Sequence, residues 1–259
     1  MKVLGLQFDV AWEDKAANYE KVSAMIAAAG PGPGSLVMLP EMFATGFSMN
    51  IAAVAEGPDG PTHRFLCALA RQHAVYLIAG MPAIGDGGRG KNLALVYAPD
   101  GVQVARYAKM HLFSYAGEND HYQAGCEPVT AQMGDFLAAP LICYDLRFPE
   151  LFRREARKGV HLFVVVANWP APRRDHWRTL LRARAIENQA FVIGVNRCGS
   201  DPSHTYAGDS MIIDPQGAIL ADAGDTETTI EAEIDLPGLL AWRRDFPALR
   251  DMRPADETG

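Results

Sequence analysis

The stretch Pro140-Leu-Ile-Cys-Tyr-Asp-Leu-Arg-Phe-Pro-Glu-Leu151 contains a short apolar strand, a turn and the start of a helix. Pro140–Cys143 has the composition of a buried strand. Phe148–Leu151 is typical of a helix start, because proline favours the first helical turn. A strand that leads directly into a helix is the repeating unit of layered α/β proteins. The stretch therefore predicts an α/β fold with Cys143 at a strand-to-helix turn.

Apolar runs of strand length recur on both sides of this stretch. Several are hydrophobic throughout rather than alternating, which is typical of strands that are buried on both faces. The runs are Val3–Phe8, Leu36–Leu39, Tyr76–Met81, Leu93–Tyr97, Val102–Tyr107, Pro140–Cys143, His161–Ala167, Phe191–Asn196 and Met211–Ile213.

Two segments between these runs place apolar residues on one face of a helix. The first is followed by Gly30 and Pro31, which end a helix. The apolar positions are Val22, Met25, Ile26 and Ala29 in the first segment and Trp177, Leu180, Leu181 and Ala185 in the second. The arginines of the second region (Arg173, Arg174, Arg178, Arg182 and Arg184) are interpreted as a solvated or interface face of the helix, not as a nucleic-acid site.

Two tight turns join neighbouring strands. Ala98–Gly101 and Asp214–Gly217 each contain Pro and Gly at turn positions. Hairpins of this kind predict mixed rather than purely parallel sheets. No Pro/Ser-rich linker and no internal repeat interrupts the chain, so a single domain is expected over residues 1–259, with a polar tail from about residue 251.

Composition limits the partners and the compartment. The 259 residues are 49% hydrophobic and 21% charged, and 24 basic against 31 acidic residues give a formal net charge of −7. An acidic chain is a poor match for nucleic acid. No apolar run approaches the roughly 20 residues of a membrane span, and the strand-like Val3–Phe8 stands where a secretory leader would lie. We therefore expect a cytoplasmic protein with no membrane partner.

Four cysteines lie far apart, with no CxxC pair, so neither a disulfide framework nor a zinc site is indicated. Cys143 differs from the others because a thiol at a strand-to-helix turn faces the positive end of the helix dipole, which favours the reactive thiolate. The alternative is an inert, buried cysteine. Cys67, Cys126 and Cys198 have no such setting and are assigned to structure.

Glu41 is the candidate base for this nucleophile. It follows the buried run Leu36–Leu39, at a strand end where α/β sites form, and Phe43 and Phe47 would shield it from water. The alternative is a carboxylate that caps a helix or a turn. None of the seven histidines lies in a segment that resembles a Cys–His–Asn hydrolase.

Two further charged residues follow the run Val102–Tyr107. Lys109 is placed to stabilise an oxyanion, or else is a lysine at the edge of a sheet. Glu118 lies nine positions later in a Gly-containing loop and by itself is an ordinary loop acid.

Three motifs together, Leu39-Pro-Glu41, Tyr107-Ala-Lys109 and Ile142-Cys-Tyr-Asp145, resemble the nitrilase (carbon–nitrogen hydrolase) superfamily. The order Glu, Lys, Cys and the intervals of 68 and 34 residues are similar to that pattern, and the resemblance covers essentially the whole chain. It implies a four-layer α-β-β-α sandwich with mixed sheets, a homodimer paired through its helices, and no metal or organic cofactor.

Within the superfamily the chain is most similar to bacterial ω-amidases. The segments that carry this likeness are Pro40–Met49, Cys143–Pro149, Ala167–Arg173 and Ala183–Gln189. The resemblance implies a small-molecule amide substrate. It implies hydrolysis of the ω-amide of 2-oxo acids, such as 2-oxoglutaramate or 2-oxosuccinamate, to the dicarboxylate and ammonia through a cysteine thioester.

The resemblance also implies catalytic roles. Cys143 is the nucleophile, Glu41 transfers protons, and Lys109 with the backbone N–H of Tyr144 holds the oxyanion. Glu118 matches an additional glutamate of the superfamily, which would position Lys109 or the substrate.

The substrate carboxylate needs a partner, and a guanidinium group matches it bidentately. Arg173 and Arg147 are the candidates. Arg173 is favoured because Arg147 has an alternative role in pairing with Asp145 or Glu150. A final set of aromatic residues is predicted either to wall the pocket or to belong to the core: Phe43, Tyr115 and Trp169.

Three other interpretations remain open. The same triad would serve an amidase for N-carbamoyl compounds or deaminated glutathione. A catalytically idle interaction subunit would be expected to have lost a triad residue. A redox sensor built on Cys143 would leave Glu41 and Lys109 unexplained and has no resolving cysteine nearby in sequence.

Overall fold

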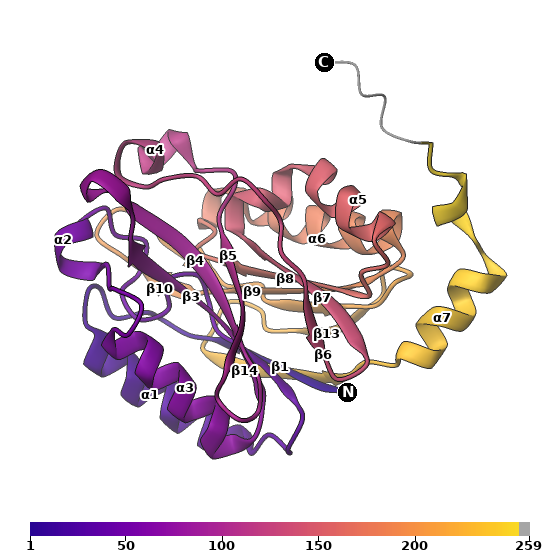
Figure 1. The fold of residues 1–259 in the computed structure, drawn as a ribbon, viewed down its shortest axis with the longest axis horizontal. Coiled ribbons are helices and arrows are strands. Elements are labelled where there is room, and N and C mark those ends of the chain that lie inside the picture. Colours follow the sequence, from indigo (N-terminus) through magenta and orange to yellow (C-terminus); the bar gives the residue numbers. More distant parts are fainter. Residues whose placement is uncertain (254–259) are drawn as a thin grey trace.

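The computed structural model describes residues 1–253 and has two six-stranded β-sheets between layers of helices (Figure 1). The first sheet has the strand order β14-β1-β2-β3-β4-β5. Its strands are β1 (Lys2–Gln7), β2 (Leu36–Met38), β3 (Tyr76–Ile84), β4 (Gly90–Tyr97), β5 (Gln103–Ala108) and β14 (Thr228–Glu233).

The second sheet has the order β13-β12-β9-β8-β7-β6. Its strands are β6 (Ala131–Met133), β7 (Phe136–Ile142), β8 (Leu162–Ala167), β9 (Phe191–Asn196), β12 (Met211–Ile213) and β13 (Ile219–Asp222). A separate two-stranded hairpin consists of β10 (Cys198–Ser200) and β11 (Thr205–Ala207).

Both sheets are mixed, as the hairpin turns predict. The central pairs β1–β2, β2–β3, β7–β8 and β8–β9 are parallel, and the outer pairs are antiparallel. The predicted turn Ala98–Gly101 joins β4 to β5, and Asp214–Gly217 joins β12 to β13. Gly101 and Gly217 have φ angles of 81° and 87°, a left-handed conformation that glycine adopts without strain.

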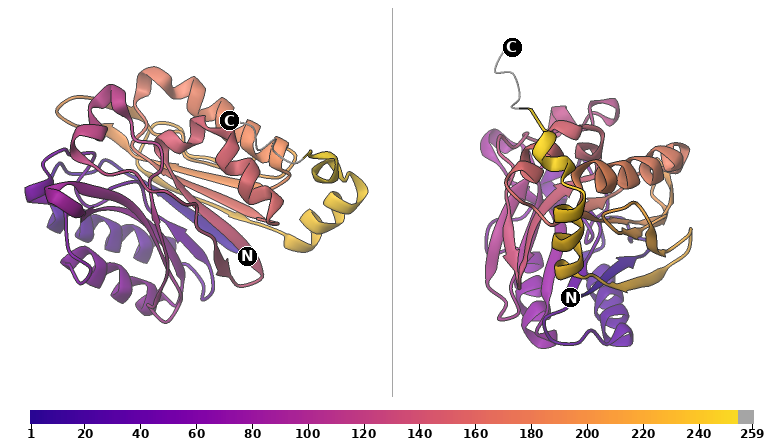
Figure 2. Two further views of the ribbon diagram at one scale, coloured as in Figure 1. Left: turned by 45° about the horizontal axis from the view of Figure 1, so that its top comes forward. Right: turned by 90° about the vertical axis from the view of Figure 1, so that its right-hand side faces the viewer.

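Helices cover the outer face of each sheet, which confirms the four-layer α-β-β-α arrangement (Figure 2). Two helices pack on the first sheet and two on the second, and the interior between the sheets is apolar. The helices are α1 (Lys15–Ala29), α2 (Ile51–Val54), α3 (Pro61–His73), α4 (Glu118–His121), α5 (Pro149–Arg157), α6 (Arg174–Asn188) and α7 (Leu236–Asp245). The short 3-10 turns are Asp86–Gly88, Ser114–Ala116, Cys143–Arg147, Ala171–Arg173 and Ala248–Asp251.

Both helices predicted from periodicity are present. In α1, Val22 and Ile26 are fully buried against the first sheet, and Gly30 ends the helix with a φ of 54°. In α6, Trp177 and Leu181 are fully buried against the second sheet. Regular spacing of apolar residues was therefore sufficient to place these two elements.

The structure corrects three details. Arg184 is not on a solvated face of α6: it is 4% exposed, and its guanidinium donates to the carbonyl of Leu146. Cys126 is exposed and contributes nothing to the core. Strand β7 ends at Ile142, so Cys143 opens the following turn instead of closing the strand.

The polar tail expected from about residue 251 begins in the turn Ala248–Asp251, and its residues 254–259 lie outside the described residues. Within residues 1–253, no helix has both the length and the apolar character needed to span a bilayer.

Candidate active site

The ends of three strands bring the three motif residues together in the interior. Glu41 follows β2, Lys109 follows β5 and Cys143 follows β7, so the two facing sheets both contribute. Glu41 and Lys109 are 0% exposed and Cys143 is 7% exposed. Residues far apart in sequence thus form one buried cluster.

Lys109 is held between two carboxylates. Its Nζ lies 2.9 Å from Oε1 of Glu41 and 2.9 Å from Oε2 of Glu118. The Asn92 amide donates to both carboxylates, at 2.7 and 2.9 Å. Burial lowers the pKa of Lys109, but Glu118 and Glu41 outweigh it and raise that pKa well above 10.5. Lys109 is therefore a permanent cation in the cluster.

Glu41 is fixed from two sides. The backbone N–H of Asn168 donates to its Oε2 at 2.8 Å, and the Asn168 side chain donates to its carbonyl oxygen at 2.7 Å. Strand β3 passes so close that a Cβ on Gly80 would lie 2.4 Å from the Cα of Glu41. Only glycine fits at position 80 with this backbone in place, so Glu41 has little freedom to move.

Cys143 occupies a sharp turn that aims its thiol into the cluster. Its φ of 46° is left-handed, which costs a non-glycine residue about 1–2 kcal/mol. The turn is held by Asp145, whose carboxylate accepts from the backbone N–H of Ile142 at 3.0 Å and from the hydroxyl of Tyr107 at 2.8 Å. Because Tyr107 lies in β5, Asp145 also couples this turn to the strand that carries Lys109.

The expected thiolate is not the resting form. Burial raises the pKa of the Cys143 thiol well above its ordinary value of 9.0; Glu41 raises it further, and the opposing effect of Lys109 is smaller. Helix α5 begins only at Pro149, beyond the 3-10 turn, so its positive end is not adjacent to the sulfur. The thiol therefore needs a base at the moment of attack.

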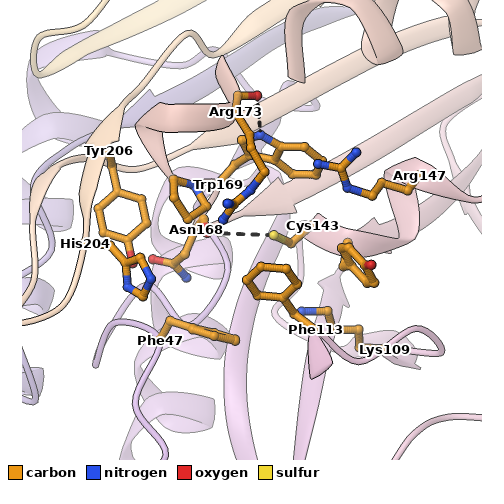
Figure 3. Close-up of a pocket in the computed structure, with 12 residues that line it drawn as sticks. Phe47, Lys109, Phe113, Cys143, Arg147, Asn168, Trp169, Arg173, His204 and Tyr206 are labelled. Atoms are coloured by element: carbon orange, nitrogen blue, oxygen red, sulfur yellow. Dashed lines mark hydrogen bonds between the residues drawn. The ribbon is translucent and has the colours of Figure 1, made fainter. Parts of the chain in front are cut away.

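A pocket of about 390 Å³ leads from the surface to this cluster (Figure 3). Lys109, Cys143 and Asn168 form its floor. Aromatic rings and a proline form much of the wall, and three basic side chains stand higher in the pocket. The remaining lining residues are Phe47, Phe113, Tyr144, Trp169, Pro170, Tyr206, Arg147, Arg173 and His204.

Both predicted arginines line the pocket, and among residues 1–253 neither forms an ion pair with an acid. The Arg147 guanidinium lies 4.8 Å from the Trp169 ring centroid, and that of Arg173 lies 5.3 Å from the Phe113 ring centroid. The alternative pairing of Arg147 with Asp145 is wrong, since Asp145 is occupied in holding the Cys143 turn. One guanidinium nitrogen of Arg147 lies 3.1 Å from Nδ1 of His176, so within residues 1–253 the guanidinium of Arg173 is the freer of the two for a ligand.

The three predicted aromatic residues have different positions. Trp169 lines the pocket and is 3% exposed. Phe43 does not line it: two residues beyond Glu41, its ring faces the helix layer and packs against Tyr19 and Phe65. Tyr115 is 82% exposed and stands outside the pocket, 5.7 Å from the Arg173 guanidinium, so it belongs to the rim rather than to the wall.

Seven residues that line or brace the pocket have no predicted role in it: Asn92, Asn168, Phe47, Phe113, Pro170, His204 and Tyr206. Asn92 is a buried polar residue within the apolar β4, and that contrast was the available signal. Asn168 lies in the segment Ala167–Arg173, which carries the family likeness, but the sequence predicts no role for it. Phe47 was considered only as a shield for Glu41. His204 lies in a turn with no apolar pattern, so nothing in the sequence marked it.

Comparison with known proteins gives concordant findings. The family model described as carbon-nitrogen hydrolase matches residues 4–244. The chain is 36% identical over 249 residues to the 2-oxoglutaramate amidase of Bacillus subtilis, covering 96% of each protein. It is 41% identical over 259 residues to the omega-amidase YafV of Escherichia coli K12, covering 99% of this chain and 97% of that protein.

Solved structures agree. The crystal structure of XC1258 from Xanthomonas campestris, described as a CN-hydrolase superfamily protein with an arsenic adduct in the active site, matches with a TM-score of 0.93 at 34% identity and covers 98% of each chain. Saccharomyces cerevisiae Nit3, described as a nitrilase-superfamily member, matches with a TM-score of 0.86 at 28% identity over 95% of this chain and 94% of that chain.

Proposed function

The chain belongs to the carbon-nitrogen hydrolase family and is a hydrolase of amide bonds, and we propose that it cleaves the ω-amide of 2-oxo acids. The substrates would be 2-oxoglutaramate or 2-oxosuccinamate, and the products the 2-oxo dicarboxylate and ammonia. One observation carries the proposal: two guanidinium groups that have no acidic partner within residues 1–253 line a pocket whose floor includes Cys143 and Lys109. The names of the relatives from B. subtilis and E. coli support the same substrate class.

In the proposed acylation step, the sulfur of Cys143 attacks the amide carbonyl carbon while Glu41 takes the thiol proton. Because burial keeps the resting thiol protonated, proton transfer accompanies the attack. The carbonyl electrons move onto oxygen, and this oxyanion is stabilised by the Lys109 ammonium and the backbone N–H of Tyr144.

The intermediate then collapses. Glu41 returns the proton to the amide nitrogen, the carbon–nitrogen bond breaks, and ammonia leaves a thioester on Cys143. In deacylation, Glu41 removes a proton from water, which attacks the thioester carbonyl through the same oxyanion site. The cysteine sulfur departs and is reprotonated, which regenerates the resting thiol.

The mouth of the pocket, where Arg147 and Arg173 stand, would bind the carboxylate end of the substrate. A guanidinium presents a planar fork of N–H donors that matches a carboxylate. Arg147 and Arg173 each stack on an aromatic ring, which limits their freedom before the ligand arrives. Bound in this way, the carboxylate fixes the distance at which the amide reaches Cys143.

Ammonia release tests this proposal. Purified protein is incubated with 2-oxoglutaramate, glutamine, an N-carbamoyl amino acid and deaminated glutathione, and the Cys143→Ala variant serves as the blank. Preferential turnover of 2-oxoglutaramate, absent in the variant, is the expected result. Turnover of the N-carbamoyl compound or of deaminated glutathione alone would overturn the substrate assignment, and no turnover of any amide by folded protein would favour an interaction subunit.

A further inference from the structure

The hairpin β10–β11 places a histidine in the pocket from a different part of the fold than either arginine. His204 lies in the turn between β10 and β11 and lines the same pocket as Cys143. In Figure 3 the imidazole stands beside Asn168 and Phe47, on the side of the pocket away from Arg147. The three basic residues above the floor therefore approach a ligand from different sides.

The turn that carries His204 is fixed by Asp201. Its Oδ1 accepts from the backbone N–H groups of Ser203 and His204, each at 2.7 Å. Its Oδ2 accepts from the hydroxyl of Tyr206 at 2.5 Å. The imidazole Nδ1 of His204 lies 3.8 Å from Oδ1 of Asp201, which is too long for a hydrogen bond. The backbone is thus held in place while the ring keeps its hydrogen-bonding capacity.

Three other polar side chains in the pocket already have partners. The indole N–H of Trp169 donates to the carbonyl of Arg173 at 2.8 Å. The hydroxyl of Tyr206 is used by Asp201, and the side-chain amide of Asn168 by Glu41. Two uncharged side chains that line the pocket have a donor group without a hydrogen-bond partner within residues 1–253: the imidazole of His204 and the hydroxyl of Tyr144. The Tyr144 ring lies beside Arg147, 5.8 Å from its guanidinium, whereas the imidazole of His204 stands on the opposite side of the pocket.

A 2-oxo acid amide presents two polar groups besides its amide: a carboxylate and a ketone oxygen. The carboxylate matches a guanidinium fork, which leaves the ketone oxygen in need of a donor. If the substrate displaces water from this side of the pocket, an oxygen left without a donor would weaken its binding. An imidazole N–H of His204, on the side of the pocket away from Arg147, and the substrate's remaining acceptor are therefore complementary.

We propose that His204 is a specificity-determining residue, which donates a ring N–H to the 2-oxo oxygen of the substrate. The inference rests on the proposed function and extends it to the ketone, the group that distinguishes 2-oxo acid amides from ordinary amides. Neutral imidazole exchanges between its two tautomers, so the ketone oxygen selects the one with the proton facing it. A 2-ammonium group, as in glutamine, would bring a donor and a positive charge to the same place. Among residues 1–253, no Asp or Glu lines the pocket to receive it.

A cycle of two substrates and four proteins tests the proposal. The substrates are 2-oxoglutaramate and glutaramate, the monoamide of glutaric acid, which has the same carboxylate and amide but no ketone. The proteins are wild type, His204→Leu, His204→Gln and the control Ser203→Ala. Ser203 is exposed in the same turn, and its replacement leaves the ring in place.

The expected result is a loss confined to one substrate. For His204→Leu, kcat/KM should fall about 10- to 100-fold with 2-oxoglutaramate and less than about 2-fold with glutaramate. His204→Gln, which keeps an N–H donor, should recover most of that loss, and Ser203→Ala should behave as wild type.

Equal losses on both substrates, or no loss on either, would overturn the role of His204 while leaving the amidase proposal intact. Failure of the wild-type protein to hydrolyse 2-oxoglutaramate would instead remove the proposed function, and the inference would fall with it. Folding of each variant is checked by its thermal unfolding midpoint, and the glutaramate rate serves as an internal control for an intact floor.

Discussion

The floor and the mouth of the pocket are built on opposite principles. At the floor, the Lys109 ammonium is 0% exposed and lies 2.9 Å from each of two equally buried carboxylates beneath it, those of Glu41 and Glu118. At the mouth, Arg147 and Arg173 are half-buried and have no acidic partner within residues 1–253. The floor is complete before a ligand arrives, whereas the mouth has donors left over. We infer that the floor performs the chemistry and the mouth selects the substrate.

The two regions should also differ in their contribution to stability. Removing one member of a buried ion pair leaves the other charge uncompensated, at a cost of about 3–5 kcal/mol. Removing a partly exposed side chain that pairs with no acid costs little beyond its packing. Substitutions of the paired charges at Lys109, Glu41 and Glu118 should therefore affect both folding and turnover, and those at the mouth should affect substrate binding alone.

The largest effect is expected at the nucleophile. Cys143→Ala should lower kcat by on the order of 10⁴-fold or more, because no other group can form the thioester. Its thermal unfolding midpoint should stay near that of wild type, since alanine keeps the Cβ at this left-handed position and only the sulfur atom is removed. Residual ammonia release above one per cent of wild type, measured with enzyme free of contaminating amidase, would assign the chemistry to another residue.

A smaller effect on turnover, with a clear effect on stability, is expected at Glu118. Glu118→Gln removes one of the two carboxylates that hold Lys109, so the unfolding free energy should fall by about 3 kcal/mol. The kcat should fall about 100-fold as the ammonium loses its fixed position. Urea unfolding and steady-state kinetics measure the two quantities. Glu150→Gln, an exposed glutamate on α5, is the matched control and should change neither.

At the mouth, the change should appear in KM. Arg173→Met removes a charged donor for the substrate carboxylate, which corresponds to a rise of about 10- to 100-fold in KM for 2-oxoglutaramate. Its kcat should stay within about 3-fold and its unfolding free energy within about 0.5 kcal/mol of wild type. Arg244→Met, at an exposed arginine of α7, controls for the loss of charge. A fall in kcat at constant KM would place Arg173 in the chemical step.

The smallest effect is expected in the pH dependence of stability. Burial raises the pKa of the Cys143 thiol above its ordinary value of 9.0, so the unfolded chain loses this proton at lower pH than the folded one. The stability contribution is thus fully present below pH 9 and is lost as the pH rises above it, at no more than about 1.4 kcal/mol per pH unit. Between pH 8 and about pH 10.5, the unfolding free energy measured in urea should fall less for Cys143→Ala than for wild type. If the unfolding free energies of the two proteins fall in parallel with pH, the assignment of Cys143 as a buried thiol is contradicted.

The sequence predicted the floor better than the mouth, for a physical reason. Glu41, Lys109 and Cys143 each follow an apolar strand, and strand ends are recognisable from local hydrophobicity. The mouth is assembled from side chains on turns, whose direction depends on backbone angles and packing that local patterns do not encode. Phe43 therefore faces the helix layer, Tyr115 stands in solvent, and His204 had no sequence signal.

The same limit applies to protonation. The helix start at Pro149 was correctly predicted, yet the inferred thiolate at Cys143 was wrong. Tertiary packing buries the sulfur and brings Glu41 close to it from the opposite sheet. Sequence spacing gives the order of the catalytic residues but not the electrostatic balance between them.

The most direct test of this division compares two substrates on the unmodified protein. Ammonia release is measured with 2-oxoglutaramate and with its methyl ester, which keeps the amide and the ketone but carries no negative charge. The account predicts that kcat/KM falls at least about 10-fold for the ester, mainly through KM, because the mouth recognises the carboxylate and the floor does not. Equal kcat/KM values for the acid and the ester would contradict it.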